Sequence, residues 1–198
     1  MKNNVLLTGQ VVTKRVFGNA KDKTVFITMR VKAGKREEYP VVKIEGSPAW
    51  EAISEIRKND WLAVSGKFTK YKKKDGTFVE EITCDKFLCH SIYVNPGAYK
   101  NEVRLEGIVK GIYSLTNGLT SICMETVTNA EKKKVISMNV DIYRDIEKIG
   151  LSIGDRLEVI GYVSTRKNKK NKNEQHIVML CYDKTDFSDE ELACSRVM

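Results

Sequence analysis

The sequence predicts an all-β protein built from two consecutive five-stranded barrels, with one short helix in each. One observation behind this prediction is a repeat: Val5–Val11 recurs as Val103–Val109, and Asn59–Gly66 recurs as Gly154–Gly161. The offsets are 98 and 95 residues and the order is kept, so we infer a duplicated domain. The other observation is a period of two in the apolar residues of most segments, which is typical of half-buried strands.

The chain length fits two such domains. Its 198 residues suffice for two domains of about 100 residues each. Asn95-Pro96-Gly97 is a turn signal between the two repeats. We therefore place the first domain at 1–95, the second at 99–185, and a short acidic tail or helix at 186–198.

Five strands are expected in the first repeat. They are Val5–Val11, Val25–Val31, Val41–Glu45, Leu62–Phe68 and Thr77–Thr83. Asp75-Gly76, between the last two strands, is a favoured hairpin turn. Phe68 shares its strand face with the apolar residues Leu62 and Val64, which assigns the Phe68 ring to the core.

A helix is expected between the third and fourth strands of each repeat. In the first repeat Ser47 is its cap, Pro48 suits its first turn, and apolar residues follow at a three-residue step. These are Trp50, Ile53 and Ile56. The second repeat places Ile142, Ile146 and Ile149 at the same point of the repeat, after Asp141 as a plausible cap. We interpret Trp50 as a packing residue between helix and barrel rather than a platform for bases.

Each repeat is expected to contain three strands, a helix and a two-strand hairpin, in that order. This element order predicts two tandem five-stranded OB-fold barrels. Gly9 and Gly66, in the first and fourth strands, fit points at which a small barrel bends sharply. An OB barrel binds oligonucleotides on the face of its second and third strands and through its first and fourth loops. Candidate binding residues are therefore sought on those elements.

The charge distribution favours a polyanionic partner. The net charge is +8. The first 98 residues carry 18 Lys and Arg against 11 Asp and Glu, residues 99–185 carry 15 against 11, and residues 186–198 carry one against four. Two basic domains are typical of nucleic-acid binding, although in many basic proteins the charge only favours solubility.

Several function classes find no support in the sequence. No apolar run approaches the roughly 20 residues of a membrane-spanning helix, and the start is too quickly polar for a signal peptide, so we expect a cytoplasmic protein. Five widely spaced cysteines form no disulfide framework. Cys84, Cys89 and His90 lack a second ligand pair, so we expect buried thiols on a strand and no metal or other cofactor. Without a phosphate-binding loop or a nucleophile motif, we expect no enzymatic activity.

Four segments of the first repeat carry a family resemblance. They are Asn4–Gly9, Val25–Val31, Tyr39–Val42 and Lys58–Gly66. These segments resemble the bacterial single-stranded DNA-binding protein family, which typically has an Asn-x-Val-x-Leu-x-Gly strand, an aromatic residue entering the third strand and a Lys-Gly-Asp-like turn. The resemblance covers most of residues 3–87, with a weaker echo over 101–182. It implies a protein that coats single-stranded DNA and, for a chain with two barrels, a homodimer of four barrels.

Two segments depart from that family. The first loop, Phe17–Asp22, is short. The family usually has a long tail rich in Gly, Gln and Pro that ends in acids and Pro-Phe, whereas this chain has only Asp186–Glu191 before it ends at Cys194–Met198. The resemblance therefore implies little about recruitment of other proteins through an acidic tip.

Binding of single strands without sequence preference requires cations for the phosphates and flat side chains on which bases stack. The first repeat offers both on its second and third strands and at the end of its fourth. The candidates are Phe26, Arg30, Tyr39, Lys43, Tyr71, Lys72, Lys73 and Lys74. The resemblance places Tyr39, and less closely Tyr71, where the family has stacking aromatics. Three alternatives stay open: Phe26 at an interface, Trp61 in the core or under a base, and the lysines as a solvated hairpin tip.

The second repeat is weaker on the corresponding face. At an offset of 95, Ser121 replaces Phe26 and Glu125 replaces Arg30, so we predict that stacking groups are missing there. Its fourth loop keeps a run of cations. We propose phosphate contacts from Arg166, Lys167, Lys169 and Lys170. The hypothesis is an asymmetric pair, in which the first barrel stacks bases and the second supplies electrostatic attraction or subunit contacts.

These observations predict a cytoplasmic, nucleoid-associated protein that coats and protects single-stranded DNA in replication, recombination or repair. Its partners are then single-stranded DNA and proteins of those processes. The weak second face suggests an alternative, a replisome or primosome adaptor with little or no DNA binding. OB barrels also bind RNA, so an RNA-binding protein is a further alternative.

Overall fold

The computed structural model describes residues 2–19, 22–72, 76, 78–89, 94–116, 118–129, 134–167 and 173–185. We call the part up to residue 89 the N-terminal half and the part from residue 100 the C-terminal half. The N-terminal half contains β1 (Asn3–Gly18), β2 (Lys23–Ala33), β3 (Arg36–Glu38), β4 (Val41–Glu45), α1 (Ser47–Glu55), β5 (Trp61–Lys72) and β6 (Phe78–Cys89). The C-terminal half contains β7 (Lys100–Thr116), β8 (Leu119–Asn129), β9 (Lys134–Ile142), the short 3-10 helix η1 (Ile146–Lys148), β10 (Arg156–Lys167) and β11 (Asn173–Lys184).

Five strands of the N-terminal half form a closed barrel. β1 pairs with β2 and β5, β2 pairs with β4, and β6 pairs with β5 and, in parallel, with β4. The predicted order of three strands, a helix and a hairpin is confirmed here, with the short β3 added beside β2. The strands β7 to β11 pair in the same order, including a parallel pair of β9 with β11 and a pair of β7 with β10.

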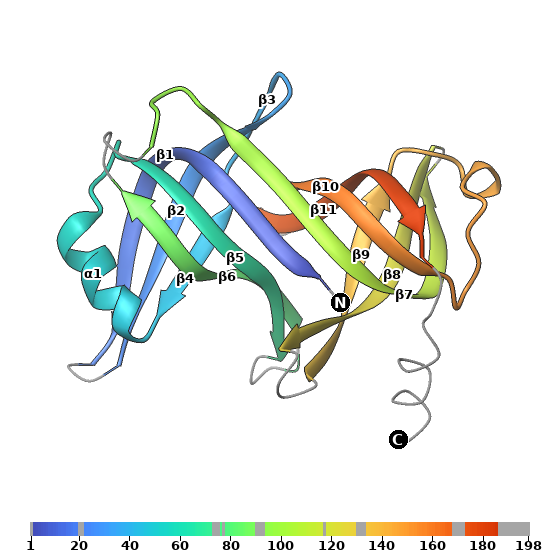
Figure 1. Cartoon of the computed structure of the whole chain (residues 1–198), viewed down its shortest axis with the longest axis horizontal. Helices are drawn as coiled ribbons and strands as arrows, with labels where there is room; N and C mark the ends of the chain where they lie inside the picture. The colour runs from blue at the N-terminus through green and yellow to red at the C-terminus, as the bar shows by residue number, and fades with distance from the viewer. Residues whose placement is uncertain are drawn as a thin grey trace.

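β1 and β7 run side by side and join the two halves (Figure 1). Val5 pairs with Val103, its counterpart in the sequence repeat, while Asn3 pairs with Leu105 and Leu7 with Asn101. This register is symmetric about the Val5–Val103 pair, so the two strands are related by a local two-fold axis. The connection between the halves turns at the predicted place, where the N–H of residue 98 donates to the carbonyl of residue 95 over 3.1 Å.

The repeated residues make the same buried contacts in both halves. The Asn3 amide donates to the carbonyl of Phe68 over 2.9 Å and accepts from the Phe68 N–H over 3.0 Å. The Asn101 amide makes the same two bonds with Val163, each 2.8 Å long. An amide side chain paired in this way satisfies a backbone donor and acceptor that no strand reaches.

Two glycines explain how the barrel strands cross so closely. A Cβ at Gly66 would collide with the carbonyl oxygen of Thr83, and a Cβ at Gly161 would collide with that of Val178. Only glycine permits this approach of two backbones, and the two positions correspond in the repeat. The predicted role of glycine in the barrel strands is therefore explained by backbone contact.

The core contains the apolar residues that the alternation predicts. Phe68 is fully buried, which confirms its assignment, and Val25, Ile27 and other inward residues of β2 are fully buried as well. Cys84 and Cys89 are buried on β6, which confirms the interpretation of these thiols. Burial raises the pKa of the Cys84 thiol to about 12.

The helix of the N-terminal half forms where predicted but packs differently. Pro48 lies in its first turn, and Ser47 is inside the helix rather than its cap, since Gly46 is the N-cap and no side chain bonds there. The residues of α1 that are buried are Ala49 and Ala52. Trp50 is half exposed, so the prediction that it packs against the barrel is wrong.

The predicted helix of the C-terminal half is replaced by a single turn. Ile142 ends β9 and is buried there, and η1 begins only at Ile146, after the N-cap Asp145. The prediction of one helix in each repeat, capped by Asp141, is therefore wrong for the second. No helix in the described ranges is long and apolar enough to cross a membrane.

Candidate nucleic-acid interface

The outward side of β2 and β4 carries three predicted binding residues, Phe26, Arg30 and Lys43. We call this side, together with the neighbouring Tyr39 and Tyr71, the strand face. Phe26 lies between two fully buried residues of β2, one of them Ile27, and Arg30 also lies between two fully buried residues. The alternation of the strand therefore turns the side chains of Phe26 and Arg30 outward. Phe26 pairs directly with Lys43 across the two strands. β2 and β4 thus present one ring and two cations on the outside of the barrel.

Aromatic rings gather at the Phe26 end of the strand face. Phe17, at the end of β1, lies edge to face against Phe26 with 5.6 Å between the ring centroids. Lys43 Nζ lies 5.8 Å from the centroid of the Tyr71 ring, and Tyr71 is 43% exposed. Phe26, Lys43 and Tyr71, predicted from three different strands, are therefore brought together here.

Carboxylates neutralise the cation of this cluster. Lys43 Nζ lies 2.5 Å from a Glu45 oxygen and 3.0 Å from a Glu81 oxygen. Burial lowers the pKa of Lys43, but the hydrogen bonds to Glu45 and Glu81 outweigh it and raise the pKa overall. Lys43 stays charged, yet a phosphate near it would have to compete with two acids.

Arg30 and Tyr39 occupy the other end of the strand face. Arg30 Nη2 donates to Gln10 over 2.5 Å, and Arg30 Nη1 lies 3.9 Å from Glu37. The Tyr39 ring is 37% exposed and its hydroxyl donates to Glu37 over 2.8 Å, which raises the pKa of Tyr39. The Tyr39 ring is therefore accessible to a base, with a cation beside it.

Arg166 is held by neighbours on the C-terminal half. Arg166 Nη1 lies 3.4 Å from the nearly buried carboxylate of Asp141, and Arg166 Nη2 donates to the hydroxyl of Tyr143 over 2.8 Å. The guanidinium carbon lies 5.9 Å from the centroid of the Tyr143 ring. Lys167 follows as an exposed residue at the end of β10.

The lysines of the two hairpin tips are only partly described. Lys72 ends β5, and the structure describes its backbone alone. The predicted residues Lys73, Lys74, Lys169 and Lys170 lie outside the described residues. Their phosphate contacts therefore stay predictions.

Three exposed aromatic residues were missed by the sequence analysis. Phe17, Tyr113 and Tyr143 are each more than half exposed. The sequence predicts a loop at Phe17, which instead lies on β1. Tyr143 directly follows β9, within the segment where the sequence predicts the second helix. Tyr113 follows a register shift after Val109, and its ring lies against Gly111, where a Cβ would collide with it.

These residues correct the prediction that the second repeat lacks stacking groups. Tyr113 pairs directly with Ser121, the counterpart of Phe26, so a ring is present one strand away. Glu125, the counterpart of Arg30, forms an ion pair with Lys110 over 3.0 Å. Lys110 therefore balances the carboxylate on this face, and exposed rings lie at neighbouring positions rather than at the counterpart of Phe26.

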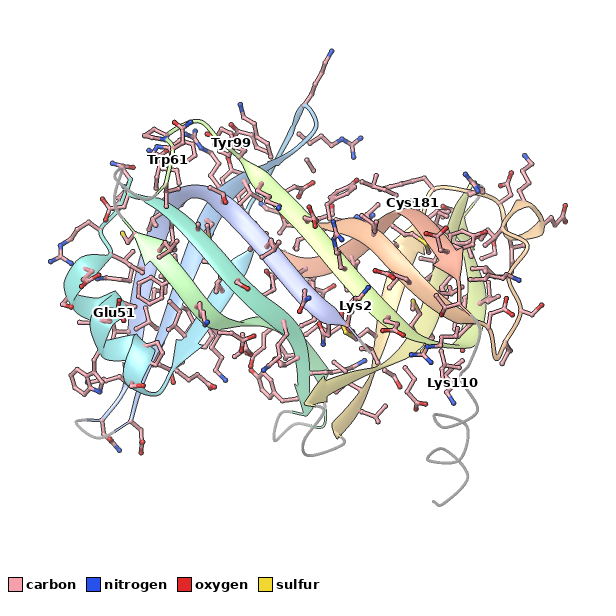
Figure 2. All side chains as sticks on the ribbon, viewed as in Figure 1. Lys2, Glu51, Trp61, Tyr99, Lys110 and Cys181 are labelled. Atoms are coloured by element: carbon pink, nitrogen blue, oxygen red, sulfur yellow. The ribbon has the colours of Figure 1, made fainter. Side chains whose placement is uncertain are left out.

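Trp61, whose role the sequence leaves open, packs against the connection between the two halves. Trp61 lies against Tyr99 with 4.9 Å between the ring centroids (Figure 2). Lys32 Nζ lies 4.5 Å from the centroid of the Tyr99 ring. Trp61 is partly buried under this connection rather than in the core of the barrel.

The two halves also touch beside the strand face. The Tyr39 N–H donates to the hydroxyl of Thr165 over 3.0 Å, so the start of the strand face meets β10. Lys70 Nζ on β5 donates to the carbonyl of Ser137 on β9 over 2.9 Å. Each half thus extends its last hairpin towards the other half.

Comparison with solved structures finds this fold in the single-stranded DNA-binding protein of Thermus aquaticus. A deletion variant that also carries one substitution matches with a TM-score of 0.72 at 18% sequence identity, over 96% of this chain and 98% of that one. The wild-type protein matches with a TM-score of 0.71 at 14% identity, over 94% of each chain. No protein-family model and no curated protein matches the chain. At these identities the likeness establishes a shared fold.

Proposed function

We propose that the protein binds single-stranded DNA without sequence preference and coats it during replication, recombination or repair. The observation that carries this proposal is the set of accessible rings, Phe26, Tyr39 and Tyr71, beside cations on one side of an OB-type barrel. Stacking on such rings tolerates any sequence because every base has a π face. The proteins of the same fold from Thermus aquaticus are named for single-stranded DNA binding, which supports the same class of ligand.

The proposal includes two tandem OB barrels, in domains at 1–95 and 99–185, followed by the tail at 186–198. Its support is the shared pairing order of the strands and the matching contacts of Asn3 and Asn101. The first barrel would stack bases on the strand face. The second would add Tyr113, Tyr143 and the cations of its Arg166–Lys170 loop.

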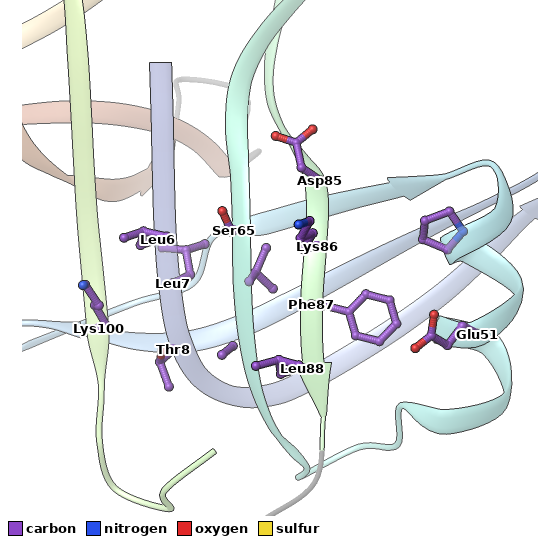
Figure 3. Close-up of a pocket in the computed structure, with 13 residues that line it drawn as sticks. Leu6, Leu7, Thr8, Glu51, Ser65, Asp85, Lys86, Phe87, Leu88 and Lys100 are labelled. Carbon is purple, nitrogen blue, oxygen red and sulfur yellow. The ribbon is translucent and has the colours of Figure 1, made fainter. Parts of the chain in front are cut away.

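We also propose that two chains form a homodimer with four barrels. A groove of about 590 Å³ lies on the outside of β1, β5 and β6, beside α1 (Figure 3). Leu6, Ala63 and Leu88 are among its lining residues, and Leu88 is more than half exposed. Burial of such apolar surface against a second copy would stabilise the dimer. Light scattering of the free protein tests this, and a monomer would contradict it.

Titration with a labelled oligo-dT tests the function. We expect submicromolar binding at moderate salt, with log affinity falling by about 0.7 per phosphate neutralised as log salt rises. No detectable binding would contradict the proposal and favour the adaptor. Tighter binding to oligo-U RNA of the same length would instead favour an RNA-binding protein.

A further inference from the structure

A buried carboxylate joins the two halves next to the strand face. Glu38 ends β3 in the N-terminal half and is only 5% exposed. Its oxygens accept from the Thr165 N–H over 2.6 Å, from the Thr165 hydroxyl over 2.9 Å and from the Ser164 hydroxyl over 3.3 Å. Within the described ranges Glu38 has no ion pair, so hydrogen-bond donors of the C-terminal half hold its carboxylate.

The chain that follows Glu38 is fixed by the same strands. The Thr165 hydroxyl, which donates to Glu38, accepts from the Tyr39 N–H over 3.0 Å. The Val41 N–H donates to the Gln175 side chain over 2.6 Å. Both sides of Pro40 are therefore anchored to β10 and β11.

This anchor lies between two groups of candidate binding residues. On one side is the exposed Tyr39 ring, and on the other side Thr165 is followed directly by Arg166 and Lys167. Ordering a side chain on binding costs conformational entropy, and a residue already fixed avoids much of that cost. The anchor thus sets the backbone position of both groups before any ligand arrives.

We propose that Glu38 is a positioning residue that makes the strand face and the β10 end one composite surface for a single strand. The inference rests on the proposed function and adds the path of the ligand. A single strand of DNA stacked on Tyr39 continues across the contact between Glu38 and Thr165 to Arg166 and Lys167. Glu38 itself does not touch the strand, since its carboxylate is buried under Thr165.

The test compares Glu38→Gln with Glu102→Gln. Both changes remove one carboxylate, but Glu102 lies on β7 in ion pairs with Lys100 and Arg104. In Glu38→Gln we expect affinity for oligo-dT to fall roughly tenfold. We expect its salt slope to fall by about 0.7–1.4, the equivalent of one or two phosphate contacts. Glu102→Gln should leave the slope unchanged.

The salt slope separates positioning from a merely structural role. If the substitution only reduced stability, the melting temperature would fall while the salt slope of binding by the folded protein stayed unchanged. That result would overturn the proposal. Thr165→Val, which removes the shared hydroxyl, provides the same test if Glu38→Gln does not fold. Hydrogen exchange of the backbone amides of Tyr39 and Thr165 should be faster in whichever variant folds than in the free wild-type protein. Unchanged protection of these amides would contradict the anchoring role of Glu38.

The two proposals fail in different ways. If wild-type protein binds no oligo-dT, the proposed function fails and the composite surface fails with it. If wild-type protein binds and Glu38→Gln binds with the same affinity and slope, only the role of Glu38 is overturned.

Discussion

The two halves of the molecule keep the same interior contacts and differ on their outer faces. Asn3 and Asn101 make identical pairs of hydrogen bonds, and Gly66 and Gly161 admit the same close backbone approach. Outside, the N-terminal half carries Phe26 where the C-terminal half carries Ser121. Backbone geometry constrains the interior, whereas a ring on the surface can move to a neighbouring strand without changing the fold.

The largest effect is expected from removing two rings of the N-terminal half. Tyr39→Ala combined with Tyr71→Ala should weaken oligo-dT binding by about 2–6 kcal/mol, since each stacked base contributes about 1–3 kcal/mol. Fluorescence titration measures the loss. Trp50→Ala is the control, because Trp50 is a half-exposed ring on α1 that is not among the proposed binding residues. Unchanged affinity in the double variant would contradict DNA binding at the strand face.

The equivalence of the interiors can be tested by stability. Asn3→Leu and Asn101→Leu each leave a buried backbone donor and acceptor unpaired, which should cost about 1–3 kcal/mol of unfolding free energy. Urea denaturation of the two variants should give similar losses. A loss confined to one variant would contradict the structural equivalence of the two amides.

The outer face of the C-terminal half is expected to contribute less than that of the N-terminal half. Tyr143→Ala should weaken binding by about 1 kcal/mol, at the low end for a stacked base, because Arg166 already engages the hydroxyl of Tyr143. Tyr143→Phe keeps the ring and should bind as wild type. If both variants lose affinity equally, the hydroxyl rather than the ring is responsible.

Charge reversal in the segment 166–172, the predicted fourth loop of the second repeat, should act mainly at low salt. Lys167→Glu with Lys169→Glu should reduce the salt slope by about 1.4, because about 0.7 is expected for each phosphate that the loop no longer neutralises. At high salt the affinity should approach that of wild type. An equal loss at all salt concentrations would mean that the loop does not act through phosphate contacts.

The smallest effect is expected for the pH dependence of stability that arises from Glu80. Burial raises the pKa of Glu80, although the neighbouring Lys70 opposes this. Between the ordinary glutamate pKa and the raised one, the folded state keeps a proton that the unfolded state loses, so stability falls as pH rises through that window. Glu80→Gln should therefore raise the denaturation midpoint at pH 7 and have no such effect below pH 4.

Glu102→Gln is the control for that pH effect. The hydrogen bond from Arg104 lowers the pKa of Glu102, so its ionised form stabilises the folded state and the substitution should lower the midpoint at pH 7. Shifts of the same sign in the two variants would contradict the opposite pKa directions.

The sequence predicts the parts of the fold that depend on local periodicity. Alternation located β2 and the buried Phe68, and the repeat anticipated the shared role of Gly66 and Gly161. The strand period of two also identifies Phe26 on the outward side of β2, whereas Tyr39 is predicted from the family resemblance.

The rest depends on contacts between segments far apart in the chain. A register shift in β7 changes the phase of Tyr113, and no local pattern reports it. Glu81 on β6 neutralises Lys43, and Thr165 holds Glu38, only because the fold brings these strands together. Trp50 stays exposed because Ala49 and Ala52 face the barrel.

Photocrosslinking can locate bound single-stranded DNA on the surface of the protein. A single-stranded oligonucleotide carrying 5-iododeoxyuridine is bound to the full chain, irradiated and mapped by mass spectrometry. The account predicts adducts at Tyr39 and Tyr71, with further adducts at Phe26 or Tyr143. Adducts confined to rings outside the proposed surface, such as Trp50 on α1 or Phe87 on β6, would contradict it.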